Sequence, residues 1–91
     1  MALVAASKEN KTKLVPKLIK KGTSVNQKDD FGHDALYYAS NHGNEAILKR
    51  LLTNGAEINA QSPDCLTALH EASMHGHVNC AEILCNQGKR L

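Results

Sequence analysis

The sequence repeats itself three times with a period of 33 residues. Five positions of the period hold the same residue type in all three copies: Leu3, Leu36 and Leu69; Ala6, Ala39 and Ala72; Ser7, Ser40 and Ser73; Leu18, Leu51 and Leu84; Gly22, Gly55 and Gly88. A period of this length is typical of a stacked array, in which each unit buries its apolar face against its neighbours. The sequence therefore predicts three stacked units, and function has to be sought on their surface.

Each unit is expected to contain two short helices. The shared leucines and alanine have helical spacing, and the shared glycine stands where the second helix has to end, because glycine adopts the left-handed conformation that terminates a helix. The expected helices cover residues 2–9, 12–20, 35–41, 45–53, 68–74 and 78–86. Pro16 fits its helix only in the opening turn, where a missing N–H costs little. Thr12 would then be the N-cap of that helix.

Two segments resemble the ankyrin repeat. One has Leu36, Gly43-Asn44 and Arg50-Leu51-Leu52-Thr53-Asn54-Gly55-Ala56-Glu57-Ile58-Asn59, and the other has Leu66-Thr67-Ala68-Leu69-His70-Glu71-Ala72 and Gly76-His77. The resemblance implies a mainly α ankyrin-repeat solenoid of helix-turn-helix pairs with short β-hairpin fingers. We expect one domain over residues 1–91, with repeats at 1–28, 29–61 and 62–91 and the first repeat lacking a finger before it. The fingers are expected at about residues 25–33 and 60–66.

Composition limits the class of protein. A hydrophobic content of 42% with only 3% aromatic residues fits an aliphatic core of closely stacked helices. No apolar run approaches the roughly 18 residues of a membrane span, and the apolar start is too short for a signal peptide. Cys65, Cys80 and Cys85 are odd in number, and the last two align with Ile47 and Leu52. We therefore expect small buried apolar cysteines in a reducing compartment, cytoplasm or nucleus.

The five histidines raise the question of a metal or catalytic site. His75-Gly76-His77 followed by Cys80 looks like a ligand set, but Cys80 aligns with the core residue Ile47 and should face away from His75. The family resemblance gives His70 and His77 structural hydrogen bonds. No nucleophile with an adjacent base and no Gly-rich phosphate loop is present, so we expect no metal, no cofactor and no enzyme activity.

The resemblance implies a binding surface made by the fingers and the exposed side of the first helix of each unit. Its variable positions, which we name the inner strip, are Lys8, Glu9, Asp30, Phe31, His33, Tyr38, Asn41, His42, Pro63, Asp64, Leu66, Glu71, Met74 and His75. Phe31, Leu66 and Met74 are apolar where the fold accepts a polar group, as in the core of a binding patch, although Phe31 and Leu66 could equally be half-buried finger residues. Asp30, Asp64 and Glu71 favour a basic ligand.

Three hypotheses for function follow. The first is a non-catalytic, monomeric module that binds a partner protein or peptide with basic residues on the inner strip. The second is a nuclear reader of a basic tail such as a histone tail, because Leu69-His70-Glu71-Ala72 is similar to a tetrapeptide of chromatin-reading ankyrin domains. Those domains add a tryptophan and an asparagine where this chain has Leu66 and Met74, while Asn41 holds the asparagine position one unit earlier. The third is a structural spacer within a larger scaffold protein.

Basic residues are concentrated at the amino-terminal end. Residues 1–21 contain six lysines and one acid, a net charge of +5, whereas the remaining residues contain five bases and eight acids, a net charge of −3. Most of these lysines fall on the second expected helix, as a solvated face or as a contact for phosphate or nucleic acid. No aromatic residues are interleaved with them, so we do not expect a base-stacking surface or a nucleic-acid partner.

Asn59 is a candidate modification site. Leu51, Glu57, Ile58 and Asn59 match the pattern of ankyrin asparagines that are hydroxylated by an oxygen-dependent dioxygenase. The same side chain could equally form hydrogen bonds within a finger turn. Leu91 aligns with Ile58, inside the turn that would begin another finger, and we expect further repeats or another domain to follow.

Overall fold

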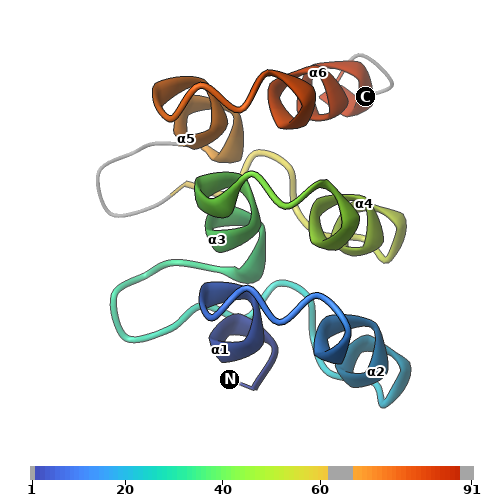
Figure 1. Ribbon diagram of the computed structural model, residues 1–91. Coiled ribbons are helices and arrows are strands. Elements are labelled where there is room, and N and C mark those ends of the chain that lie inside the picture. The colour runs from blue at the N-terminus through green and yellow to red at the C-terminus, as the bar shows by residue number, and fades with distance from the viewer. Residues whose placement is uncertain (1, 62–66, 89–91) are drawn as a thin grey trace.

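Three helix pairs are stacked one upon another (Figure 1). The computed structural model describes residues 2–61 and 67–88, and in these residues the helices are α1 (Ala2–Lys8), α2 (Leu14–Lys20), α3 (Ala35–His42), α4 (Glu45–Thr53), α5 (Ala68–Met74) and α6 (Val78–Gly88). α3 packs between α1 and α5 in one layer, and α4 packs between α2 and α6 in the other. The loop between α2 and α3 projects on the side of α1, α3 and α5, away from the layer of α2, α4 and α6.

The expected mainly α architecture is confirmed, and most helix bounds agree with the expectation to within one residue. The largest differences are at α2, which begins at Leu14 rather than at residue 12, and at α6, which extends to Gly88. Pro16 is the third residue of α2 and so lies in its opening turn, as expected. Thr12 is not the N-cap: Lys13 holds that position, and the Thr12 hydroxyl instead accepts a 2.7 Å hydrogen bond from the Asn44 amide.

The core is aliphatic and follows the 33-residue register. In α4, Ile47, Leu48 and Leu51 recur at helical spacing and form one apolar stripe that the neighbouring pairs cover completely. Fully burying a leucine side chain contributes about 2 kcal/mol, so this stripe is a large part of the stability of the stack. The cluster of buried residues runs through all three pairs: Leu3, Ala6, Val15, Ala35, Leu36, Ala39, Ile47, Leu48, Leu51, Ala68, Ala72, Cys80 and Leu84.

Polar side chains cap the N-termini of α3, α4 and α5. At α3 the Asp34 carboxylate accepts a 2.9 Å hydrogen bond from the Tyr37 N–H, and at α4 the Asn44 amide oxygen accepts one of 3.1 Å from Ile47. Burial raises the pKa of the Asp34 carboxyl, an effect that the bond from Tyr37 opposes. At α5, Thr67 and His70 form a reciprocal capping box, which confirms the structural role expected for His70.

The first finger is not a β-hairpin. Within residues 2–61 and 67–88 the only strand-like pairing is an isolated antiparallel bridge between Lys28 and Asp34. The Asp29 carboxylate accepts hydrogen bonds from the N–H groups of Phe31 and His33, which a hairpin ladder would otherwise use. The Asp29 N–H also donates a 2.8 Å hydrogen bond to the His33 carbonyl, so side-chain and backbone bonds together close a tight turn in place of the expected strands. The expected finger at 60–66 lies mostly outside the described residues.

Side chains also link consecutive pairs. His77 donates a 2.8 Å hydrogen bond through Nε2 to the carbonyl of Asn41, which confirms its expected structural role, and His42 donates one of 2.6 Å to the carbonyl of Lys8. Gly43 has a φ of +71°, and a Cβ placed there would lie 2.5 Å from the His77 ring. The turn between α3 and α4 therefore depends on glycine both for its backbone conformation and for the close approach of the next pair.

The two cysteines in the described residues occupy different environments. Cys80 is 1% exposed, as expected, and burial raises the pKa of its thiol, with the Glu45 charge acting in the same direction. Cys85 is exposed, so the expectation that it is buried like Leu52 is wrong. Leu52 is partly buried against the core, on a helix that has described helix pairs on both sides, whereas α6 packs chiefly against α5 and α4 among the described helices.

Thiol labelling should distinguish these cysteines. We expect Cys85 to react with a maleimide at least about tenfold faster than Cys80 in the folded protein, because only a thiolate that reagents can reach is reactive. Peptide mass spectrometry after short labelling times measures both rates. In urea the two rates should become similar, and equal rates in buffer alone would contradict the burial of Cys80.

Candidate functional site

The inner strip is distributed over α1, the first finger, α3 and α5. Pro63, Asp64 and Leu66 lie outside the described residues. The strip residues at the end of α1 are exposed, as are Asp30, Phe31, His42, Met74 and His75, while His33, Tyr38 and Asn41 are half-buried. Glu71 differs from all of these because it is only 3% exposed.

Phe31 and Met74 are exposed apolar side chains on this side of the molecule. They are 66% and 63% exposed, so the interpretation of Phe31 as a half-buried finger residue is wrong. The Lys8 Nζ lies 5.7 Å from the centroid of the Phe31 ring, in the range of a cation–π contact. The face of this ring is thus already placed where it attracts a positive charge.

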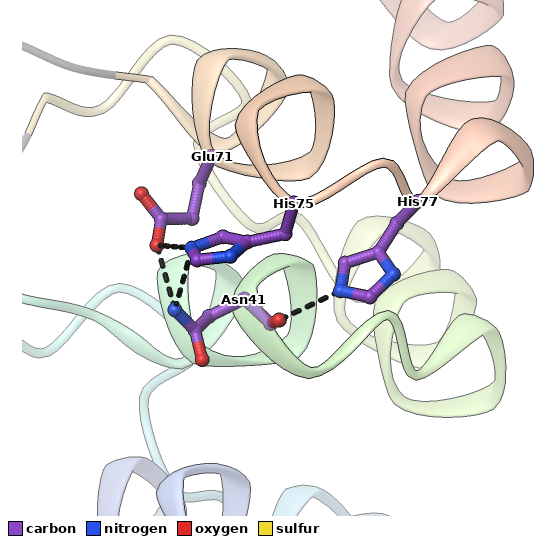
Figure 2. Close-up of polar contacts among 4 residues, drawn as sticks. All are labelled: Asn41, Glu71, His75 and His77. Carbon is purple, nitrogen blue, oxygen red and sulfur yellow. Dashed lines mark hydrogen bonds and ion pairs between the residues drawn. The ribbon is translucent and has the colours of Figure 1, made fainter.

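Asn41, Glu71 and His75 form a polar cluster where α3 meets α5 (Figure 2). The Asn41 Nδ2 donates a 2.7 Å hydrogen bond to Glu71 Oε1, and His75 Nε2 lies 3.1 Å from the same oxygen and 3.3 Å from Asn41 Nδ2. Asn41 comes from the second helix pair, whereas Glu71 lies on α5 and His75, four residues later, is the C-cap of that helix. Figure 2 shows the amide and the imidazole converging on one carboxylate oxygen.

This cluster satisfies a buried carboxylate with polar partners. Asn41 Nδ2 is a donor, so His75 Nε2 satisfies Glu71 only when it also carries a proton, and the contact becomes an ion pair when the imidazole is charged. A buried carboxylate is stable only with such donors around it. Asn41 and His75 therefore fix the Glu71 carboxylate in position, and His75, which is itself exposed, covers it on the solvent side.

A second cluster holds the finger against α3. The Tyr38 hydroxyl donates to Asp29 Oδ2 and lies 3.3 Å from His33 Nδ1, and the His33 ring stacks on Tyr37 with centroids 3.9 Å apart. Burial and the neighbouring Asp29 raise the pKa of Tyr38. Burial alone would raise the pKa of Asp29, but the bonds from Tyr38 and from backbone N–H groups outweigh it and lower that pKa. The phenol stays protonated at neutral pH, which suits it to positioning the finger.

A family model described as ankyrin repeats, in three copies, matches residues 2–91. The chain belongs to the ankyrin repeat family. A search among curated proteins gives no match to this chain. Ankyrin repeats generally serve as protein–protein interaction modules, and the family is generally non-catalytic.

Two further observations concern the described residues of this ankyrin domain. In the part of the chain that the structure describes, no three side chains of histidine, cysteine, aspartate or glutamate come together as a group that could hold a metal ion. No helix among residues 2–61 and 67–88 is both long and apolar enough to span a membrane.

Asn26 is a residue that the sequence analysis missed. Its amide donates a 3.3 Å hydrogen bond to the Gly55 carbonyl and accepts one of 2.7 Å from the Glu57 N–H, so it joins the ends of two successive ankyrin units. The 33-residue register could have identified Asn26, because it occupies the position equivalent to Asn59 one repeat earlier. Asn59 itself is exposed, and its N–H donates to Glu57 Oε1 at 3.3 Å.

Proposed function

We propose that this chain is a non-catalytic intracellular ankyrin module that binds a basic, extended segment of a partner protein along the inner strip. The observation that supports this proposal is the Glu71 carboxylate, held by Asn41 and His75 where α3 meets α5, on the side of the stack where the loop between α2 and α3 projects. A lysine or arginine of the partner could pair with this carboxylate in the place that the exposed His75 side chain takes in the free chain.

The surroundings of Glu71 fit the same ligand. Asp30 adds an exposed carboxylate, and Phe31 and Met74 add apolar area that a peptide can cover. Phe31 presents its face to the Lys8 ammonium, and an arginine of the partner could stack there in the same way. Carboxylates on a rigid surface would set the register of a basic peptide more than its total affinity.

Recognition of a histone-like tail is the second candidate. The contact that favours it is the 2.7 Å hydrogen bond between Asn41 and Glu71, which brings an amide and a carboxylate from successive repeats to one point. An amide beside a carboxylate can orient a particular basic side chain, whereas a carboxylate alone attracts any cation.

Binding of a basic peptide tests the proposal. The probe is a short fluorescein-labelled peptide in which lysine and arginine alternate with alanine, measured by fluorescence anisotropy. Glu71→Gln preserves the shape of the side chain and removes its charge, and we expect it to weaken binding by about tenfold or more, since a hydrogen bond to a charged group contributes about 1.5–3 kcal/mol. Glu82→Gln on α6 is the matched control, because Glu82 is an exposed acid on the other layer, and we expect it to bind like the unchanged protein.

Other outcomes separate the hypotheses. The proposal would be contradicted if Glu71→Gln and Phe31→Ala bound the peptide as tightly as Glu82→Gln and the unchanged protein. The structural-spacer hypothesis would then be the one that remains. A histone-tail peptide that binds more tightly than a scrambled peptide of the same composition would support the tail reader, whereas equal affinities would exclude sequence-specific reading. Thermal unfolding of each variant checks that the fold is intact.

A further inference from the structure

A basic hollow is lined by residues of α2 and of α4 with its C-cap Asn54. These two helices belong to the layer opposite α1, α3 and α5 (Figure 1). The hollow has a volume of about 390 Å³, and its lining residues are Pro16, Lys17, Ile19, Lys20, Arg50 and Asn54. All three charged residues of the lining are basic, and all three are exposed. The hollow therefore combines concentrated positive charge with a small apolar wall.

These cations are not neutralised by neighbouring acids. Among residues 2–61 and 67–88 the ion pairs are Lys11 with Glu9 and His75 with Glu71, and neither involves the hollow. Three like charges around one depression repel one another, so they lower the stability of the free protein unless an anion binds there.

The helix dipole favours all three cations, because Lys17 and Lys20 lie in the last turn of α2 and Arg50 lies in the last turn of α4. This interaction acts within each helix and does not require that the two sets of cations line one hollow. Stacking of repeats does not require the cations, because Thr53 and Ile83 occupy the positions equivalent to Lys20 and Arg50 one repeat later.

We propose that this hollow binds a phosphorylated serine or threonine in a peptide segment of a partner protein. A phosphate monoester carries a charge of about −1.5 to −2 at neutral pH and three acceptor oxygens, which suits a hollow lined by three basic side chains. The Arg50 guanidinium suits a bidentate contact with phosphate, and the two lysines supply point charges beside it. Pro16 and Ile19 cover an apolar side chain next to the phosphorylated residue.

The lining favours a phosphopeptide over other anionic macromolecules. It contains no aromatic residue on which a nucleic-acid base could stack. Pro16 and Ile19 are only partly exposed and offer little area for insertion into a lipid surface. A single hollow of this volume is at the small end of ligand pockets, which begin at about 300 Å³, and suits one anionic group with its neighbour.

The test uses the whole chain and a fluorescein-labelled peptide with a phosphoserine and a leucine two residues after it. We expect the phosphorylated peptide to bind at least about tenfold more tightly than the same peptide without phosphate. A triple variant, Lys17→Ala, Lys20→Ala and Arg50→Ala, should lose this preference. A control triple variant, Lys13→Ala, Lys21→Ala and Lys49→Ala, removes the same charge outside the lining and should keep it. Glu71→Gln should leave phosphopeptide binding unchanged, since the two surfaces are separate.

Three results would overturn the proposal. The first is equal affinity for the phosphorylated and unphosphorylated peptides. The second is an equal loss in both triple variants, which would show general attraction by net charge. The third is tighter binding of a single-stranded oligonucleotide, or of vesicles containing phosphoinositides, than of the phosphopeptide. Circular dichroism spectra of both triple variants establish that any loss is not due to unfolding.

Discussion

Leu51→Ala is expected to lower the free energy of unfolding by about 3–4 kcal/mol. Leu51 is 0% exposed in the middle helix pair, and truncation of a buried leucine loses its transfer free energy and leaves a cavity, a combined cost of about 2–5 kcal/mol. Helix pairs lie on both sides of α4 and prevent the site from collapsing. Because a domain of this size has a total stability of only about 5–10 kcal/mol, the variant should unfold at a much lower urea concentration.

Leu52→Ala is the matched control for Leu51→Ala. It removes the same atoms from the next residue of the same helix, but Leu52 is half-buried. We expect about half the loss of stability. Urea denaturation followed by far-ultraviolet circular dichroism measures both variants, and equal losses would contradict the packing described for α4.

Gly43→Ala is expected to cost about 2–3 kcal/mol of unfolding free energy. The left-handed backbone accounts for about 1–2 kcal/mol, because an L residue brings its Cβ too close to the following carbonyl. The new methyl group would also lie 2.5 Å from His77 Nδ1, so the ring has to move. That movement weakens the hydrogen bond from His77 to the Asn41 carbonyl, which contributes about a further 1 kcal/mol.

Gly55→Ala isolates the backbone part of this cost. Gly55 has a φ of +88°, and a Cβ there meets nothing within 4 Å, so we expect a loss of only about 1–2 kcal/mol. Combining Gly43→Ala with His77→Ala provides a second control, since removal of the ring should reduce the cost of Gly43→Ala to that of Gly55→Ala. Chemical denaturation of the unchanged protein, Gly43→Ala, Gly55→Ala, His77→Ala and the double variant measures these costs. The cost of Gly43→Ala without the ring is the difference between the double variant and His77→Ala. If Gly43→Ala costs no more than Gly55→Ala, the close approach of His77 is refuted.

The features that could be predicted from the sequence are those that repeat with the 33-residue period. The helix pairs and the buried alanines Ala6, Ala39 and Ala72 recur in each unit, so three copies provide three indications of the same geometry. The capping role of His70 could be predicted because it depends on Thr67, only three residues away. Local spacing and burial in a stack are properties of the repeat as a whole.

The features that could not be predicted depend on contacts between units. Glu71 was expected to be exposed, but it is buried because Asn41, 30 residues earlier, meets it across the α3–α5 contact. The finger lacks strands because the Asp29 side chain captures N–H groups that a hairpin would use. The hollow between α2 and α4 likewise depends on how two units stack, although Lys17 and Arg50 share one register position.

Packing of α3 and α4 between two neighbours has a consequence for the motions of the chain. Opening the first or the last pair breaks one set of contacts between pairs, whereas opening the middle pair breaks two. Amide hydrogens of α4 should therefore exchange with deuterium more slowly than those of α2. Asn41 belongs to the slowly exchanging middle pair and Glu71 to a terminal one. A ligand that binds both Asn41 and Glu71 would stabilise α5 against local opening. Slower hydrogen exchange of the α5 amides would therefore report binding of that ligand.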